Sequence, residues 1–86
     1  MTKEIQVSIL NKRDLQKLCF AAQRCKNNIA VKIIHNNKII NAKSILGVLS
    51  LDTASTKVIS IRLIGNSTVS KEELDMCCGY FSHIIK

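Results

Sequence analysis

The sequence predicts an α+β fold, with one mainly antiparallel β-sheet and its longer helices packed on one face. Three segments alternate apolar and polar side chains, as strands with one buried face do, at residues 5–9, 29–34 and 58–64. Two other segments, residues 14–25 and 70–85, carry apolar side chains at helical spacing. With the shorter elements between them, the order along the chain is β-α-β-β-α-β-α.

Length and composition narrow the class of protein. The 86 residues are expected to form a single domain, 1–86, with one modest core and no room for a large enclosed active site. Apolar residues make up 47% of the chain, too many for disorder, and no apolar run is long enough to cross a membrane. The N-terminus lacks the apolar stretch of a signal peptide. We therefore expect a cytoplasmic protein with no membrane partner.

The first half of the chain contains a helix followed by a β-hairpin. Asp14 is the predicted N-cap of the helix, because its side chain can accept a backbone hydrogen bond there. Asn27 and Asn28 end the helix. After the second strand, Asn36-Asn37 tolerates positive φ and predicts a tight turn. The returning strand is predicted at residues 38–42.

The second half begins with a short apolar helix. Ser44 can cap this helix, which extends to Leu51 and is apolar on more than one side, so that part of it is expected to be exposed for a partner. Residues 52–57 form a polar loop. Ser70 and Glu73 have the spacing of a capping box, which predicts a last helix that runs to the C-terminus.

Positive charge is concentrated in the first half. Residues 1–43 hold nine Lys and Arg against two acids, whereas residues 44–86 hold four of each sign. This asymmetry favours an anionic partner, such as a phosphorylated group, nucleic acid or an acidic protein face, although a solvated basic face is an alternative. Nucleic-acid binding is disfavoured because none of the aromatic residues, Phe20, Tyr80 and Phe81, lies in a predicted strand.

The cysteines indicate neither a metal site nor an enzyme. None of the four forms a C-x-x-C pair, and no histidine has zinc-finger spacing from them. Cys19, Cys25, Cys77 and Cys78 are therefore expected to be small buried side chains, although Cys19, near the helix start, could be a reactive thiol. The sequence also lacks a phosphate-binding glycine loop and a Ser/His/Asp pattern. We expect no cofactor, no metal ion and no enzymatic activity.

One segment is specific enough to suggest a family. The run Asn41-Ala42-Lys43-Ser44-Ile45-Leu46-Gly47-Val48-Leu49-Ser50-Leu51 resembles the regulatory-serine segment of the HPr family. These proteins are small phosphocarriers of the bacterial sugar phosphotransferase system. The order of elements and the chain length are also similar. The resemblance implies an HPr-like open-faced β-sandwich, with a four-stranded antiparallel sheet and three helices on one face.

The resemblance assigns a regulatory role to Ser44. In many Gram-positive bacteria a dedicated kinase phosphorylates the serine that opens the short helix of this family. A phosphate there would meet unpaired amides at the positive end of the helix. Ile45, Leu46 and Leu49 would then form the apolar docking patch, joined by Gln16 and Lys17 of the preceding helix. The alternative is that Ser44 is a plain N-cap.

The second functional position of the family departs from its pattern. HPr proteins open their first helix with Gly-Leu-His-Ala-Arg-Pro, and the histidine carries the phosphoryl group. Here residues 14–19 read Asp-Leu-Gln-Lys-Leu-Cys. Alignment on the leucine places Gln16 at the histidine position, whereas an ungapped alignment from Ser44 places Arg13 there. Neither side chain has the ring nitrogen that phosphohistidine transfer needs.

The two histidines of the chain lie elsewhere. His35 is predicted to be a solvent-facing residue at the hairpin turn, and His83 lies near the C-terminus. A glutamine at the histidine position resembles Crh, a branch of the family that keeps the regulatory serine and binds a transcriptional regulator. We therefore predict a regulatory protein of carbon catabolite control without histidine phosphocarrier chemistry. The alternatives are a basic nucleic-acid-binding module and a divergent phosphocarrier.

The predicted partners are proteins. The resemblance implies HPr kinase, components of the phosphotransferase system or a catabolite transcriptional regulator. The exposed apolar patch also permits self-association, so a monomer or a weak homodimer is expected.

Overall fold

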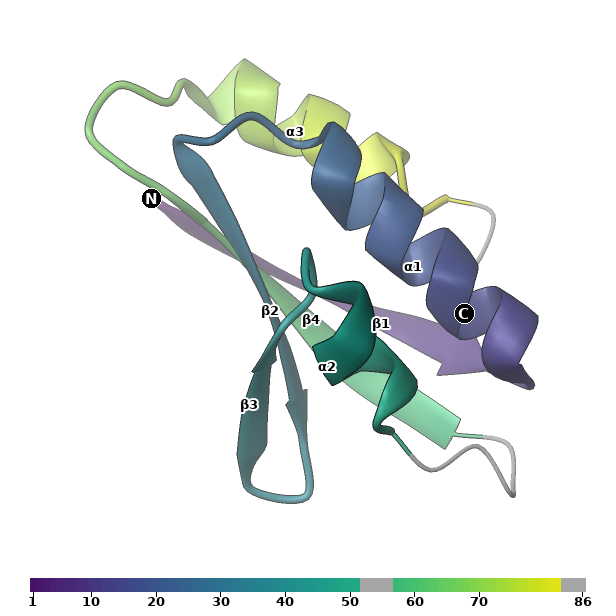
Figure 1. Cartoon of the computed structure of the whole chain (residues 1–86). Helices are drawn as coiled ribbons and strands as arrows, with labels where there is room; N and C mark the ends of the chain where they lie inside the picture. Colours follow the sequence, from purple (N-terminus) through teal and green to yellow (C-terminus); the bar gives the residue numbers. More distant parts are fainter. Residues whose placement is uncertain (52–56, 83–86) are drawn as a thin grey trace.

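The computed structural model describes residues 1–51 and 57–82 and confirms the predicted α+β fold (Figure 1). Within these residues, four strands form one sheet in the spatial order β1-β4-β2-β3, and every neighbouring pair is antiparallel. The elements are β1 (Thr2–Ile9), α1 (Lys12–Arg24), β2 (Ile29–His35), β3 (Lys38–Asn41), α2 (Ile45–Leu49), β4 (Lys57–Gly65) and α3 (Lys71–Gly79).

A row of isoleucines crosses all four strands. Ile61 of β4 lies between Ile5 of β1 and Ile33 of β2, and Ile33 pairs in turn with Ile40 of β3. Because side chains alternate along a strand, this row and its second neighbours point to one face of the sheet. A slip of one residue in any strand would turn its isoleucine toward solvent, so burial of this row determines the register.

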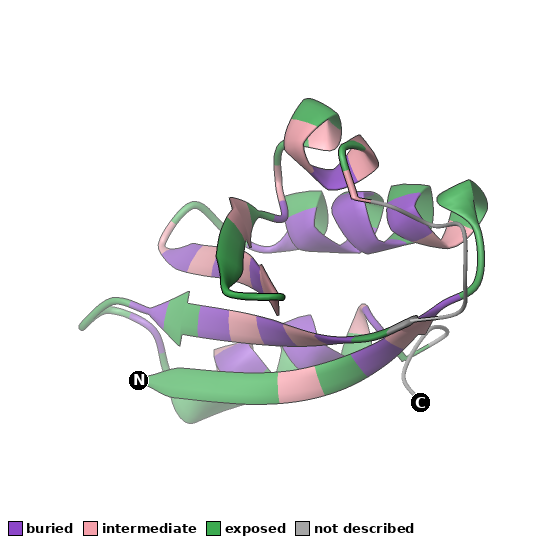
Figure 2. Cartoon of the chain, turned by 90° about the horizontal axis from the view of Figure 1, so that it is seen from below, coloured by how far each residue is buried: buried purple, intermediate pink, exposed green. Residues whose placement is uncertain are grey.

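The three helices pack against the face that carries these isoleucines, as the sequence predicted. Among the residues that the structure describes, no helix covers the other face, and Ile39 and Ile64 are exposed there. The edge strand β1 is buried only toward its end (Figure 2). Side chains from the sheet and all three helices form one core, which includes Val7, Ile9, Leu15, Leu18, Cys19, Ala22, Ile29, Val31, Ile33, Val48, Ile59, Ile61, Leu63, Leu74, Cys77 and Phe81.

The first helix begins earlier than predicted. Its N-cap is Asn11 and not Asp14, and its first residue is Lys12. The Asp14 carboxylate instead accepts a hydrogen bond from the amide of Leu10 at 2.8 Å. The prediction was wrong because two side chains in this polar run can cap a helix, and the earlier one is used. Asp14 then lies in the first turn, where its negative charge is favourable.

The last helix begins as predicted and is described as far as Gly79. Ser70 is the N-cap, and its Oγ accepts a hydrogen bond from the amide of Glu73 at 3.2 Å. The helix was predicted to continue to the C-terminus, but it ends at Gly79 with Tyr80 as its C-cap, and residues 80–82 form a turn. His83, Ile84 and Ile85, on which that prediction also depended, lie outside the described residues.

The hairpin after β2 confirms the predicted turn. Asn36 and Asn37 have φ of 49° and 64°, the conformation that asparagine tolerates better than most residues. One detail differs, because His35 is the last residue of β2, opposite Lys38, and is half-buried. The prediction of a solvent-facing turn residue was wrong because the asparagines alone form the turn.

The cysteines are free and buried, as predicted. Burial, with contributions from the neighbouring Cys77 side chain, raises the pKa of Cys25 to about 12. Burial also raises the pKa of the Cys19 thiol, which argues against a reactive thiolate at that position. Both residues act as small core side chains, Cys19 within α1 and Cys25 as its C-cap.

Candidate functional site

Ser44 lies at the surface, at the start of α2. Its backbone is extended, with φ −94° and ψ 111°, and its side chain is exposed. The Ser44 Oγ accepts a long hydrogen bond, 3.4 Å, from the amide of Gly47, and the Ser44 carbonyl accepts one from the amide of Val48 at 2.9 Å. Because Oγ is the acceptor in this cap, its own hydrogen remains for another partner.

The apolar side chains of α2 divide between the core and the surface. Val48 is fully buried, whereas Leu46 is 81% exposed. Ile45 and Leu49 are half-buried and pack against the core. The three residues of the predicted patch thus reach the surface to different extents, and Leu46 is the most exposed of them.

The start of α1 is polar and basic. Asn11 caps the helix, and Lys12 and Arg13 follow in the first turn with exposed side chains. Gln16 and Lys17 lie in the second turn and are also exposed. Of the two residues that alignment placed at the histidine position, Arg13 lies closer to the helix start. Neither it nor its neighbours at this end carry an imidazole ring.

The structure places Ser44 beside the far end of α1. The Gln23 side chain donates a hydrogen bond to the carbonyl of Lys43 at 3.2 Å, which fixes the start of α2 near the last turn of α1. Because a helix rises about 1.5 Å per residue, Arg13 lies about 15 Å along the axis from Gln23 and Gln16 about 10 Å. Figure 1 shows α2 running back toward the side where α1 begins. Ser44 is therefore tied to the last turn of α1, whereas Arg13 and Gln16 lie about two to three turns before it along the same helix.

Comparison with known proteins identifies the family. The family model of the PTS HPr component phosphorylation site matches residues 4–72, most of the chain. The chain belongs to the HPr family. A crystal structure of the phosphocarrier protein HPr from Bacillus anthracis str. Ames is similar, with a TM-score of 0.61 and 29% sequence identity over 93% of this chain and 94% of that one. No curated protein gives a significant match.

Membership of the family has direct consequences. HPr proteins are phosphocarriers of the phosphotransferase system rather than enzymes, and they act with the other proteins of that system. The match covers both regions discussed above, the start of α1 and the α2 segment with Ser44. The two regions differ in how far they keep the pattern of the family, because the serine is present and the histidine is not.

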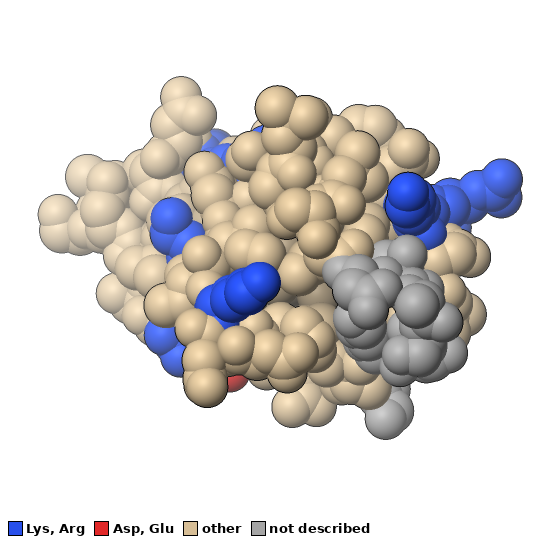
Figure 3. All heavy atoms as spheres, turned by 60° about the horizontal axis from the view of Figure 1, so that its bottom comes forward, with Lys and Arg blue, Asp and Glu red and all other residues tan. Residues whose placement is uncertain are grey.

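The surface of this HPr-family protein is unevenly charged. Figure 3 shows the lower side of the molecule, where several Lys and Arg side chains are separated by uncharged surface and very little acidic surface is visible. Lys12, Arg13 and Lys17 are exposed on α1. By contrast, three of the six acids, Glu72, Glu73 and Asp75, are on α3. The acids of α3 therefore leave the positive charge of α1 largely uncompensated.

Sequence analysis did not single out Lys43 and Gln23, whose side chains hold the segment that carries Ser44. Lys43 was read only as part of the family segment, yet its ammonium donates hydrogen bonds to the carbonyls of Lys26 and Ile29 at 3.0 and 2.7 Å. These partners lie 17 and 14 residues away, so no local pattern could have revealed them. The charge next to Ser44 is therefore directed away from the serine.

A small hollow lies between α1 and α3, and the described residues show no metal site. The hollow, of about 90 Å³, lies between the end of α1 and α3, where the Arg24 guanidinium stacks 4.3 Å above the Tyr80 ring centre. Among residues 1–51 and 57–82, no group of three His, Cys, Asp or Glu could hold a metal ion. Within the same residues, no helix is long and apolar enough to cross a membrane.

Proposed function

We propose that this HPr-family protein is a regulatory binding protein of carbon catabolite control, modulated by phosphorylation of Ser44, and that it does not relay phosphate through histidine. One contrast supports the proposal. Ser44 presents an exposed hydroxyl next to the exposed Leu46, whereas the start of α1 presents Asn11, Lys12 and Arg13.

A phosphate on Ser44 would strongly change the charge of the surface around α2. It adds about −1.5 to −2 charges and three acceptor oxygens at the start of α2. The amide of Gly47 donates a 3.4 Å hydrogen bond to Ser44 Oγ, and a charged phosphate oxygen on Ser44 could accept a shorter one from the same amide. The nearest lysine in sequence, Lys43, is bound to the carbonyls of Lys26 and Ile29. The added charge would therefore face a partner protein.

The proposed partners dock on α2 and the adjoining surface of α1. Leu46 offers the exposed apolar anchor, with Ile45 and Leu49 beside it, and Gln16 and Lys17 extend the surface along α1. HPr kinase, other proteins of the phosphotransferase system and a catabolite transcriptional regulator are the proposed partners. A modified serine beside an apolar anchor can recruit an arginine-bearing partner or repel an acidic one.

Histidine phosphotransfer would need a nucleophilic ring nitrogen. The amide nitrogens of Asn11 and Gln16 have delocalised lone pairs, and the guanidinium group of Arg13 is a hydrogen-bond donor without an acceptor nitrogen. His35, at the end of β2, is half-buried and belongs to neither candidate region. The residues at the start of α1 are suited to binding a partner and not to carrying a phosphoryl group.

The serine is tested by phosphorylation. HPr kinase and ATP are incubated with the protein, and mass spectrometry locates the phosphate. We expect one phosphate on Ser44, none on Ser44→Ala and normal labelling of Ser50→Ala. Ser50 is a matched control because it lies at the other end of the same helix and its Oγ donates to the Gly47 carbonyl. Absence of phosphate on Ser44 would contradict the proposal.

The histidine claim has a separate test. The protein is incubated with phosphoenolpyruvate and the phosphoenolpyruvate-dependent enzyme of the system, with an authentic HPr as the positive control. We expect no acid-labile phosphoryl group on this protein under conditions that label the control. An acid-labile product would favour the alternative of a divergent phosphocarrier.

A further inference from the structure

We propose that Lys43 is a positioning residue for Ser44. It fastens the segment that carries the serine to the turn between α1 and β2, and thereby holds the hydroxyl in the place where a kinase must find it. The role in phosphorylation rests on the proposed function, whereas the tether can be tested without it.

Lys43 is held by its side chain and by both of its backbone polar groups. Its Nζ donates hydrogen bonds to the carbonyls of Lys26 and Ile29, at 3.0 and 2.7 Å. Its carbonyl accepts a hydrogen bond from Gln23 at 3.2 Å, and its amide donates to Asn41 Oδ1 at 3.0 Å. Hydrogen bonds that involve a charged group are stronger than neutral ones, so the ammonium supplies the main part of this attachment.

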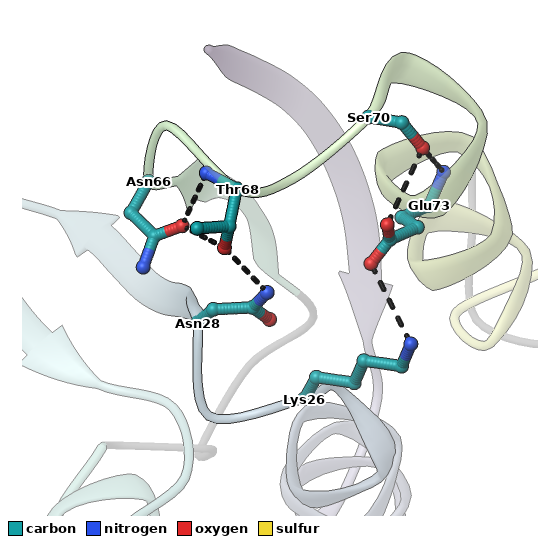
Figure 4. Close-up of polar contacts among 6 residues, drawn as sticks. All are labelled: Lys26, Asn28, Asn66, Thr68, Ser70 and Glu73. Carbon is teal, nitrogen blue, oxygen red and sulfur yellow. Dashed lines mark hydrogen bonds and ion pairs between the residues drawn. The ribbon is translucent and has the colours of Figure 1, made fainter.

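The turn that receives the ammonium is itself fixed on its other side. Asn28 Nδ2 donates to Thr68 Oγ1 at 3.1 Å, and the amide of Asn66 donates to the Asn28 carbonyl at 3.1 Å. The Lys26 ammonium lies 3.6 Å from Glu73 of α3 (Figure 4). Lys43 is therefore fastened to a part of the molecule that the loop between β4 and α3 already holds in place.

The segment on the Ser44 side needs such an anchor. The helix α2 has five residues, too few to be stable without tertiary contacts. Ala42 and Val48 are buried on either side of the serine, but Ser44 itself is exposed. Its side chain makes only the 3.4 Å cap to Gly47, and its amide donates to the carbonyl of Asn41, which lies in the same segment, at 3.1 Å. Without the ammonium of Lys43, the two buried neighbours would keep α2 on the core while the backbone at Ser44 gained freedom.

Greater mobility of the backbone at Ser44 would affect KM more than kcat. The kinase would have to order residues 43–47 on binding, and that cost weakens substrate binding. Once the hydroxyl is seated, the chemical step is unchanged. The expected signature of a positioning role is therefore a higher KM with kcat preserved.

The experiment compares three variants with the wild type. Lys43→Met removes the donors and keeps the apolar stem, Lys43→Arg restores donors, and Lys71→Met removes an equal charge from an exposed position on α3, outside the proposed docking surface. Hydrogen exchange is measured at the amides of Ser44, Gly47 and Val48. Phosphorylation kinetics are measured with HPr kinase and ATP.

We expect Lys43→Met to speed exchange at these amides about tenfold and to raise KM about tenfold, with kcat within about twofold. Lys43→Arg should recover part of both effects, and Lys71→Met should change neither. If Lys43→Met fails to fold, Gln23→Ala takes its place with the same direction of change, because it removes the hydrogen bond to the Lys43 carbonyl together with a weak one to Cys19 Sγ.

Each contrary result has a distinct meaning. Unchanged exchange in Lys43→Met would show that the tether does not exist. Faster exchange with an unchanged KM, or a loss confined to kcat, would overturn the positioning role. A wild-type protein that the kinase does not phosphorylate would overturn the proposed function, while the exchange comparison would still decide whether Lys43 holds the segment.

Discussion

The side chain of Asn11 accepts a hydrogen bond from the backbone amide of Asp14 at 3.0 Å, across the first turn of α1. This contact sets the start of the helix at Lys12. It also places two cationic side chains, Lys12 and Arg13, in the first turn, where the helix dipole disfavours positive charge. Asp14 is the one acid of that turn and partly offsets them.

The cap is therefore expected to contribute measurably to stability. Asn11→Ala should lower the free energy of unfolding by about 1 kcal/mol, because the amide of Asp14 loses its acceptor. Lys12→Ala is the matched control at the next position and should change stability by less than about 0.5 kcal/mol. Urea denaturation measures both. Equal stability of Asn11→Ala and the wild type would mean that another residue caps the helix.

Leu46 and Val48 allow binding and stability to be separated on one helix. Leu46→Ala should change the free energy of unfolding by less than about 0.5 kcal/mol, because Leu46 is 81% exposed. Val48→Ala should cost about 2 kcal/mol, because Val48 is fully buried. In a titration with HPr kinase we expect Leu46→Ala to bind about tenfold more weakly. Wild-type affinity in Leu46→Ala would remove α2 from the docking surface.

Replacement by alanine should have opposite effects on stability at two of the glycines. A Cβ on Gly65, at the end of β4, would come 2.8 Å from Cβ and Cγ1 of Val69, so Gly65→Ala should destabilise by about 1–3 kcal/mol. A Cβ on Gly79, at the end of α3, meets nothing within 4 Å, and Gly79→Ala should be neutral or stabilising by up to about 1 kcal/mol. Thermal unfolding distinguishes the two. A stable Gly65→Ala would show that the β4–α3 loop can move away.

The ion pair between Lys3 of β1 and Asp75 of α3 should make stability depend on pH. The hydrogen bond from Lys3 lowers the pKa of Asp75, and the same bond raises the pKa of Lys3. The Asp75 contribution is therefore present above its unfolded pKa of about 3.9 and lost as pH falls through the lower folded value. The Lys3 contribution is present below about 10.4 and lost as pH rises through the higher folded value.

Asp75→Asn tests this pH dependence. The variant should be slightly less stable than the wild type near neutral pH, and the difference should shrink as the pH falls through the lowered folded pKa of Asp75. The effect is expected to be small because both side chains are exposed to solvent. Urea midpoints across this range provide the measurement. A difference that persists at the acid end would point to lost packing and not to lost charge.

Most of the fold could be predicted from the sequence because it depends on local periodicity. Alternation along β2 and β4 specified which side chains face the helices, and the Ser70 cap specified where α3 begins. The start of α1 was less certain because Asn11 and Asp14 are both capping residues three positions apart. Local preference could not choose between them.

The candidate site could be predicted only in part, because local sequence preference again leaves some features undecided. Ser44 was identified as a helix cap with apolar neighbours, and the structure places it in that role. The sequence could not show that Leu46 would be exposed and Val48 buried, because a five-residue helix with four apolar residues has no single apolar face. Contact with α1 and β3 makes that distinction.

By itself, the amino-acid sequence determined the strand faces, the caps of α2 and α3 and the absence of an imidazole before residue 35. The faces and caps depend on residues a few positions apart, and the missing imidazole is a matter of composition alone. Only the tertiary structure decided that the start of α2 meets the end of α1 and that the Lys43 ammonium binds two distant carbonyls. The physical reason is that a long flexible side chain takes the acceptors that packing brings within its reach, and packing is a property of the whole fold.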